Sequence, residues 1–551
     1  MKCSDLMVKC LEEEGIEYIF GVPGEENANF MLSLQESDKI QFILTRQEQG
    51  AAFMADVYGR LTGNPAACLG TLGPGATNLV TGVADANMDH APLLCLTAQA
   101  DTERQHKASH QVMDVIAMYR PITKWAQSIY HPDNTPEIIR KAVRLARGEK
   151  PGACLVELPE DIAGREATTT PIKPRRYDHP SPDEDVINAA WEIIRSAKKP
   201  VILAGSGTMR RDAAHHLRNF VAKTGIGVIS TFMAKGVVDM DDETCTYTIG
   251  LQAHDYPAVA IDESDLVITV GYDMVEYHPD LWNKGNTHRI VHIDFLPAEI
   301  DDAYRTEIEV LGDLADALEM LTRRLDAQSE PPQYDHSHTR RARELMRKDI
   351  EEYKDDDIKG PIKPQKALWD ARQVLGPDDV LLSDVGAHKM WIARYYHCHE
   401  PNTCLISNGF CSMGFALPGA IAAQLVKPKQ RILAVCGDGG FLMNAQEMET
   451  AKRLNSNIVV MVWEDHGYGL ISWKQENEFD RHTDLSFGNP DWLKLADAFG
   501  WNGYWCEDSS KLAQTLEAAF DADGPSLVAI PIDYRENELL TERLGKIQVT
   551  I

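Results

Sequence analysis

The segment Cys436-Gly437-Asp438-Gly439-Gly440 ends an apolar run and forms a glycine-rich turn before a predicted helix at 444–455. A second apolar run, 458–463, ends at Glu464-Asp465. Both runs are typical of buried parallel strands. In a right-handed βαβ unit the two aspartates then lie at the carboxyl ends of neighbouring strands, where open α/β sheets bind ligands. The sequence therefore predicts an α/β fold with a ligand site at this sheet edge.

The chemistry of these strand ends indicates what the ligand is. Two carboxylates beside a glycine-rich turn suit a Mg²⁺ ion that holds a diphosphate group. A lone Gly-Asp-Gly is also an ordinary turn at a strand end, so the prediction depends on the second aspartate and its strand.

The paired motif resembles the thiamine-diphosphate (ThDP) enzymes, whose signature is Gly-Asp-Gly, a helix, and a strand that ends in Asn or Asp. The resemblance covers essentially the whole chain. It implies that Asp438, Asp465 and the backbone carbonyl of Gly467 bind Mg²⁺. Glu464 departs from the usual Asn at its place, but an oxygen ligand is kept at Asp465. The same resemblance implies that the cofactor also contacts Gly437, Gly439, Gly440 and Tyr468.

Helix-like and strand-like segments alternate along the chain, which is typical of parallel sheets. Ser4 is predicted to cap the first helix, and a proline-rich stretch at 171–182 marks a boundary. The resemblance implies three consecutive doubly wound parallel-sheet domains. The three are a pyrimidine-binding domain at 1–170, a central Rossmann-like domain at 185–325 and a diphosphate-binding domain at 365–551. A linker with one exposed helix is expected at 326–364, between the second and the third.

Composition narrows the class of protein. The chain has 551 residues, of which 44% are apolar and 25% charged, as in globular enzymes. A net charge of −29 argues against nucleic acid and anionic membranes as partners. The eleven cysteines include no C-x-x-C pair and no His cluster at zinc spacing, and several lie in apolar strand-like runs, so buried reduced thiols are predicted. Neither a signal-type stretch nor a membrane span is visible, and a cytoplasmic protein is expected.

Glu48 begins a predicted helix directly after a strand. The helix dipole alone favours an acidic residue there, so position does not establish a role. The resemblance adds one, because ThDP enzymes carry a glutamate in Arg-His-Glu-x-x-Ala-Ala that contacts N1′ of the aminopyrimidine. Gln47 replaces the common histidine. A carboxyl group shielded from water can share a proton with a ring nitrogen, so Glu48 is the first catalytic candidate.

Three further segments match parts of the family that contact the cofactor. Met413 resembles the methionine that wedges ThDP into its bent form, which brings the reacting atoms together. An unbranched Met is otherwise ordinary core filler. The remaining predicted contacts follow strands or open helices and are Gly73, Asn78, Gly386, Ala387 and His388.

Within the family the chain most resembles acetolactate synthases of the flavin-independent type. The segment 110–114 resembles their His-Gln-Ser-Met-Asp, and 271–279 resembles their Tyr-Asp-x-x-Glu-Tyr-x-Pro. Flavin-binding synthases carry Arg-Phe-Asp-Asp-Arg at the latter place. Gly205-Ser206-Gly207 is half a dinucleotide fingerprint, with Arg210 where the third glycine belongs. The resemblance therefore implies ThDP and Mg²⁺ as cofactors and disfavours FAD.

The predicted reaction is condensation of two pyruvates to 2-acetolactate with release of CO₂. Gln111 is expected to orient the 2-keto acid, with His110 and Lys474 as further substrate candidates. Glu26 stands where these synthases often carry lysine, and its role is open. The resemblance also implies a homodimer or homotetramer with active sites between subunits.

Several alternatives stay open at this stage. A ThDP-dependent 2-keto-acid decarboxylase usually carries adjacent histidines in its first domain, where this chain offers His110 alone near the expected place. A carboligase with another acceptor is a second alternative. An inactive ThDP-binding regulatory paralogue is disfavoured because Glu48, Asp438 and Asp465 are all kept. A regulatory subunit, and a role in branched-chain amino acid or acetoin metabolism, are not readable from the sequence.

Overall fold

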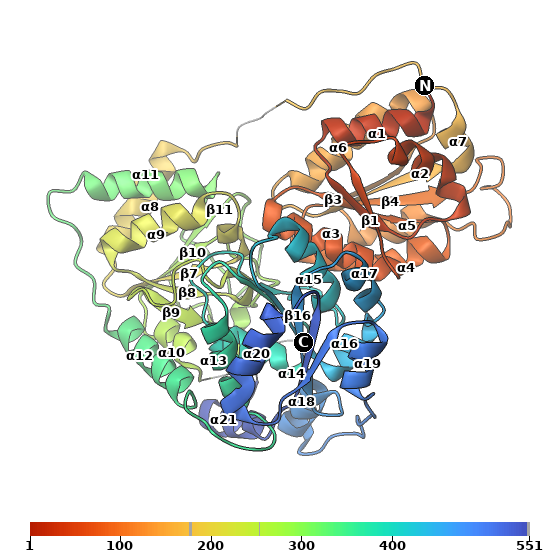
Figure 1. The fold of residues 1–551 in the computed structure, drawn as a ribbon. Coiled ribbons are helices and arrows are strands. Elements are labelled where there is room, and N and C mark those ends of the chain that lie inside the picture. Colours follow the sequence, from red (N-terminus) through yellow and green to blue (C-terminus); the bar gives the residue numbers. More distant parts are fainter. Residues whose placement is uncertain (176–178, 253, 548–551) are drawn as a thin grey trace.

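The computed structural model describes residues 1–175, 179–252 and 254–547, which form three six-stranded sheets (Figure 1). Figure 1 shows the first sheet in red and orange, the central one in yellow and green, and the third in teal and blue. Helices cover both faces of the sheets, and the apolar strands between them are buried. The predicted α/β fold with three parallel-sheet domains is confirmed.

The first sheet has the strand order β2-β1-β3-β4-β6-β5, and its paired strands are parallel. Its strands are β1 (Tyr18–Gly21), β2 (Gln41–Leu44), β3 (Ala66–Gly70), β4 (Leu93–Gln99), β5 (Trp125–Ser128) and β6 (Ala153–Pro159). Its helices are α1 (Cys3–Glu13), α2 (Ala28–Gln35), α3 (Glu48–Thr62), α4 (Pro74–Met88), α5 (Val115–Tyr119), α6 (Thr135–Arg147) and α7 (Glu160–Gly164).

The central sheet has a different order, β12-β11-β10-β7-β8-β9. Its strands are β7 (Pro200–Ala204), β8 (Gly227–Ser230), β9 (Cys245–Thr248), β10 (Leu266–Val270), β11 (Ile290–Asp294) and β12 (Ile308–Leu311). Its helices are α8 (Glu184–Ser196), α9 (Ala213–Thr224), α10 (Tyr256–Asp262) and α11 (Leu314–Asp326). The chain reverses direction across the sheet between β7 and β10, which is the topological switch point.

The third sheet, β14-β13-β15-β16-β18-β17, repeats the order of the first. Its strands are β13 (Val380–Ser383), β14 (Cys404–Ile406), β15 (Ile432–Gly437), β16 (Ile458–Glu464), β17 (Asn502–Trp505) and β18 (Ser526–Pro531). Its helices are α13 (Pro364–Val374), α14 (Ala387–Tyr395), α15 (Ala416–Val426), α16 (Asp438–Met443), α17 (Glu447–Arg453), α18 (Gly469–Phe479), α19 (Trp492–Ala498), α20 (Leu512–Asp521) and α21 (Glu536–Leu544).

Helices α3 and α15 join the first and third domains, and Figure 1 shows them side by side. The rings of Phe53 and Phe415 meet edge to face with centroids 5.6 Å apart. Gly419 lets the helices approach closely, since a Cβ there would lie 2.9 Å from Val57 Cγ2. Fully burying one aromatic side chain contributes about 1.5–3 kcal/mol, so this contact fixes the two domains in place.

The linker helix α12 (Ser337–Glu351) is only partly exposed, in contrast to the predicted exposed helix. Met346 and Ile350 face the core shared by the central and third domains. Asp349 also accepts a hydrogen bond of 3.0 Å from the buried Arg394. An amphipathic charged helix hides its apolar stripe, which composition alone does not reveal.

Two local predictions were wrong. The helix predicted at 444–455 is shorter in the structure, where α17 spans Glu447–Arg453, and a separate helix that was not predicted, α16, begins at Asp438 itself. Ser4 lies inside α1 rather than at its N-cap, and its buried hydroxyl accepts a hydrogen bond from Ser33.

All eleven cysteines are free, and all but Cys411 are buried, as predicted. Among the described residues no helix has the length and apolar character needed to cross a bilayer.

Candidate active site

Asp438 and Asp465 lie at the carboxyl ends of the neighbouring strands β15 and β16, which pair in parallel. Asp438 is 1% exposed, and its Oδ2 accepts hydrogen bonds from the amides of Asp465 (3.2 Å) and His466 (2.8 Å). These bonds aim one carboxylate at the turn that carries the other. The structure thus brings together the two predicted metal ligands.

The electrostatics of this pair fit a bound cation. Burial, and next the neighbouring Asp438 carboxylate, raise the pKa of Asp465 to about 8. Two carboxylates this close repel each other when both are ionised. A divalent cation with a preference for oxygen ligands removes that repulsion. The donor chemistry of the site therefore fits Mg²⁺.

A cavity of about 190 Å³ opens at these strand ends. Its walls come from the starts of α14, α16 and α18 and from the segment before α15. Eleven predicted cofactor contacts line it: Gly386, Ala387, His388, Met413, Gly437, Asp438, Gly439, Gly440, Asp465, Gly467 and Tyr468. The glycines keep it open, since a Cβ on Gly439 would lie 2.9 Å from the Tyr468 ring.

His388 lines this cavity and carries a buried ring nitrogen without a hydrogen-bond partner among the described residues. Its Nε2 is buried and has no hydrogen-bond partner within the described part of the chain. Burial lowers the pKa of His388 to about 3, so the imidazole is neutral. An unpaired buried N–H or lone pair is costly, which indicates that a ligand supplies the partner.

The loop that carries Met413 is fixed from two domains. Asp384, at the end of β13, accepts the Gly414 amide at 2.9 Å. Burial raises the pKa of Asp384 to about 6. Asp89, which directly follows α4 of the first domain, accepts the amides of Asn408 (3.0 Å) and Gly409 (2.6 Å). Met413 therefore enters the cavity from a rigid segment.

The predicted residues of the first domain gather on one face. Glu48 is the first residue of α3 and 8% exposed, and its Oε2 accepts a hydrogen bond of 3.0 Å from Asn78 Nδ2. Gly73, with φ +56°, precedes α4, and a Cβ on it would lie 2.9 Å from Cβ of Gln111. The turn before α4 thus brings Glu48, Asn78 and Gln111 to the same region.

Glu48, Asn78 and Gln111 do not line the cavity of their own chain. Among the described residues that line the cavity, none belongs to 1–170. His110 and Gln111 are exposed, and Lys474 lies on α18 outside the lining residues. Glu26 accepts a hydrogen bond of 2.9 Å from Thr71 on the first-domain face. One chain therefore supplies the predicted site as two separated halves.

Two polar residues at the site were missed by sequence reasoning. Asn489 Nδ2 donates to Asp438 Oδ2 at 2.7 Å and to Glu464 Oε1 at 3.1 Å. Glu447 on α17 accepts the amides of Arg46 and Gln47, both at 3.1 Å, directly before Glu48. Both contacts join segments distant in sequence. The acidic residue in the first turn of a helix was the one visible signal for Glu447.

The chain matches three family models of thiamine pyrophosphate enzymes. Residues 1–118 match the N-terminal TPP binding domain, 187–321 the central domain, and 384–530 the C-terminal TPP binding domain. The residues matched by the C-terminal model include β15 and β16, at whose ends the cavity lies.

Similar proteins carry one name. The chain is 33% identical to the acetolactate synthase of Bacillus subtilis, over 98% of this chain and 95% of that protein. It is 36% identical to the catabolic acetolactate synthase of Raoultella terrigena, over 99% of this chain and 98% of that protein. The acetolactate synthase large subunit of Parasynechococcus marenigrum is 31% identical, over 96% of this chain and 87% of that protein.

Proposed function

Since the chain belongs to the acetolactate synthase family of thiamine pyrophosphate enzymes, we propose that it joins two pyruvates into 2-acetolactate with release of CO₂. The observation that carries this proposal is the pair Asp438 and Asp465 at neighbouring strand ends, beside a glycine-lined cavity. That geometry suits a metal-held diphosphate, and the family supplies the reaction. The substrates are therefore 2-keto acids.

Asp438, Asp465 and the carbonyl of Gly467 would hold Mg²⁺, whose positive charge would bind the diphosphate. Neutral His388 would donate from its unpaired ring nitrogen to a diphosphate oxygen. The glycines at 437, 439 and 440 let the backbone amides approach that group closely.

Thiamine diphosphate, when bound, supplies a carbon nucleophile and a ring that accepts the electron pair released with CO₂. Glu48 would hold a proton on its carboxyl and share it with the pyrimidine ring nitrogen. Asn78 orients that carboxyl through its 3.0 Å hydrogen bond. Met413, on its rigid loop, would keep the cofactor bent, which is a positioning role.

The separation of the two half-sites supports an active site shared between subunits. Glu48 and Asn78 belong to one face, and the cavity of the same chain is lined by residues of the third domain. A second copy of the chain, with the two faces exchanged by a twofold axis, would complete two sites at once. A homodimer, or a homotetramer of two such dimers, is the assembly that we propose.

Gln111 would orient the substrate from the exposed segment 110–114, whose backbone packs against Gly73. His110 lies beside it, and Lys474 on α18 offers a cation to an acceptor carboxylate. In the proposed assembly, His110 and Gln111 would approach the site from one half and Lys474 from the other. We propose that they select the acceptor keto acid.

The central domain supports a flavin-free enzyme. At the switch point after β7, the Ser206 amide donates to Glu276 Oε1 at 2.8 Å, and Thr231 donates to the same carboxylate. Gly207 donates to the Gly271 carbonyl at 2.9 Å. The amides that would bind a dinucleotide diphosphate are thus already paired with the chain's own oxygens.

Product analysis tests the function. The protein is incubated with pyruvate, ThDP and Mg²⁺, and acetolactate is measured as acetoin after acid decarboxylation. Acetaldehyde without acetolactate would assign a decarboxylase, and turnover only with another acceptor would assign a different carboligase. No turnover with any 2-keto acid would assign an inactive paralogue. Purified protein with a flavin absorbance spectrum would contradict the flavin-free proposal.

A further inference from the structure

A turn of the central domain and a short segment of the third domain contact each other outside the cavity of the proposed active site. One is 239–241, before β9 in the central domain, and the other is 397–399, after α14 in the third domain. Met240 N donates to the Cys398 carbonyl at 3.1 Å, and Cys398 N donates to Met240 Sδ at 3.1 Å. Both middle residues are buried. The flanking side chains are therefore carried on a fixed frame.

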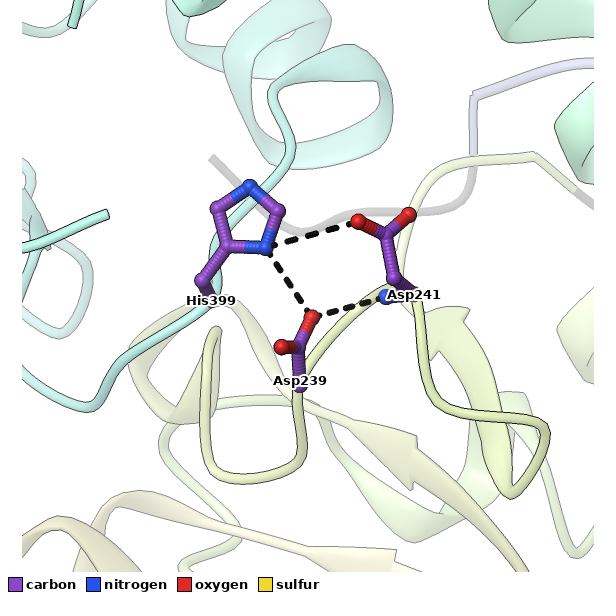
Figure 2. Close-up of side chains that lie close together, drawn as sticks. All are labelled: Asp239, Asp241 and His399. Carbon is purple, nitrogen blue, oxygen red and sulfur yellow. Dashed lines mark hydrogen bonds and ion pairs between the residues drawn. The ribbon is translucent and has the colours of Figure 1, made fainter. Parts of the chain in front are cut away.

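Three of the flanking side chains converge on one point (Figure 2). His399 Nδ1 lies 3.0 Å from Asp239 Oδ1 and 3.7 Å from Asp241 Oδ2. All three ligand atoms lie within 4.8 Å of one another. The Asp241 amide donates to Asp239 Oδ1 at 2.8 Å, which orients that carboxylate. A hydrogen bond to a ligand of this kind is a common second contact at metal sites.

We propose that Asp239, Asp241 and His399 bind a divalent transition-metal ion of the Zn²⁺ or Co²⁺ class. Ligand bonds of about 2.1 Å at tetrahedral angles separate donor atoms by about 3.4 Å. The two nitrogen–oxygen distances of 3.0 and 3.7 Å bracket that separation, and all three donor atoms lie within 4.8 Å of one another. A mixed imidazole and carboxylate set favours these ions over Mg²⁺.

The three proposed ligands lie at the wall of a cavity of about 540 Å³, which has room for a further ligand. The cavity is lined by Asp239, Asp241 and His399, and also by His397. Nε2 of His397 is buried and has no hydrogen-bond partner within the described part of the chain. Three protein ligands leave room for a metal-bound water in this cavity. The unpaired ring nitrogen of His397, which lines the same cavity, would form a hydrogen bond with that water.

An ordinary ion pair accounts less well for this arrangement. The side chains of Asp239 and Asp241 are 42% and 68% exposed, and an exposed pair contributes only about 0–1 kcal/mol. Two carboxylates beside one imidazole also leave a negative charge in excess. A divalent ion neutralises both carboxylates and links the central domain to the third. The site would thus act as a clamp between domains, separate from the catalytic Mg²⁺.

The experiment uses tag-free, full-length protein saturated with ThDP and Mg²⁺, so that the catalytic site is filled. Co²⁺ alone is then titrated and followed by its visible ligand-field absorption, with bound metal counted after equilibrium dialysis. We expect one Co²⁺ per chain. Asp239→Asn and His399→Ala should each weaken its binding at least about tenfold. His215→Ala, which removes an exposed histidine of α9, should leave it unchanged.

Anomalous diffraction from crystals soaked in Zn²⁺ locates the ion independently of any variant. Density between Asp239, Asp241 and His399 is the expected result. Co²⁺ bound equally by all variants, Zn²⁺ density only at Asp438 and Asp465, or no bound transition metal would each overturn the proposal. The two test variants should keep wild-type acetolactate formation, because neither residue lies in the active site. Their retained turnover shows that they fold.

Discussion

The first and third sheets have the same strand order, yet their strand ends carry different chemistry. In the third, β15 and β16 end at two aspartates and a cavity. In the first, the corresponding strands β3 and β4 end at Gly70 and Gln99, and the acidic residue is Glu48, at the start of α3. The two sheets teach that a fold supplies a place for a site, and a few strand-end residues decide what it does.

Loss of the metal site in the third domain is expected to reduce activity the most. Asp438→Asn replaces a carboxylate that is 1% exposed with a neutral amide. Because metal ions contribute several kcal/mol to catalysis, we expect activity to fall at least about 10²-fold. ThDP and Mg²⁺ binding, measured by equilibrium dialysis, should fall together. Asp378→Asn, at an exposed position, is the control, and tight cofactor binding by the Asp438 variant would remove Asp438 from the metal site.

Glu48→Gln tests the half of the site that the first domain supplies, and unlike Asp438→Asn it should leave ThDP binding intact. It removes the shared proton while keeping the shape, so we expect turnover to fall about 10²–10⁴-fold with ThDP still bound. Steady-state kinetics and dialysis measure the two effects separately. Glu137→Gln changes an exposed glutamate in the first turn of α6 and controls for the helix dipole. Near-normal turnover of the Glu48 variant would exclude it from the mechanism.

Mixing the two inactive variants decides whether the halves come from different chains. A hybrid dimer of Asp438→Asn and Glu48→Gln chains contains one intact site if Glu48 of one chain faces the metal site of the other. Such a hybrid, isolated with two affinity tags, should show about half of the wild-type activity per dimer. If each site used residues of one chain, every hybrid would stay inactive.

The third sheet was predictable from the sequence because its strands are buried on both faces and read as continuous apolar runs, as in 432–437 and 458–464. The cavity-lining glycines and aspartates follow these runs directly. The helix predicted to begin at Asn444 begins instead at Glu447, because the chain turns at Asn444, whose side chain donates to the Gly414 carbonyl at 2.8 Å. That contact spans two distant segments, which periodicity does not report.

Asn489 and Glu447 were not predictable for the same reason. Asn489 lies in a loop without any local sequence pattern, and only its 2.7 Å hydrogen bond to Asp438 indicates its role. Glu447 reads as an ordinary helix-start acid, and its meaning comes from the amides it accepts before Glu48. Family resemblance carried the roles of Glu48 and Met413, which the residues alone left open. The domain boundaries stay predictions.

Asn489→Ala should have a smaller effect than either aspartate or glutamate variant. Asn489 contacts a metal ligand without being one, and such residues typically change metal affinity about 10–100-fold. We expect a higher Mg²⁺ concentration for half-maximal activity, with turnover at saturating Mg²⁺ close to wild type. Asn64→Ala, in an exposed first-domain turn, is the matched control. An unchanged Mg²⁺ requirement would show that Asn489 does not orient Asp438.

The central sheet differs from the other two, because a carboxylate of the chain itself, that of Glu276, occupies its switch point. Burial raises the pKa of Glu276 to about 7, above its ordinary value of 4.5. Between these pH values the native state binds more protons than the unfolded state, so the free energy of unfolding falls as pH rises through this window. The loss is complete above the folded pKa.

Glu276→Gln should therefore flatten the pH dependence of stability between about pH 4.5 and 7, by about 1–3 kcal/mol after allowance for partial exposure. Urea unfolding of the variant and of Glu243→Gln, an exposed glutamate, measures the difference across that window. Because the neutral side chain still accepts the Ser206 amide, the switch point stays filled and acetolactate formation should be unchanged. An unchanged slope would mean that Glu276 has the same pKa in the folded and unfolded states, and burial at the switch point would then not account for the pH dependence of stability.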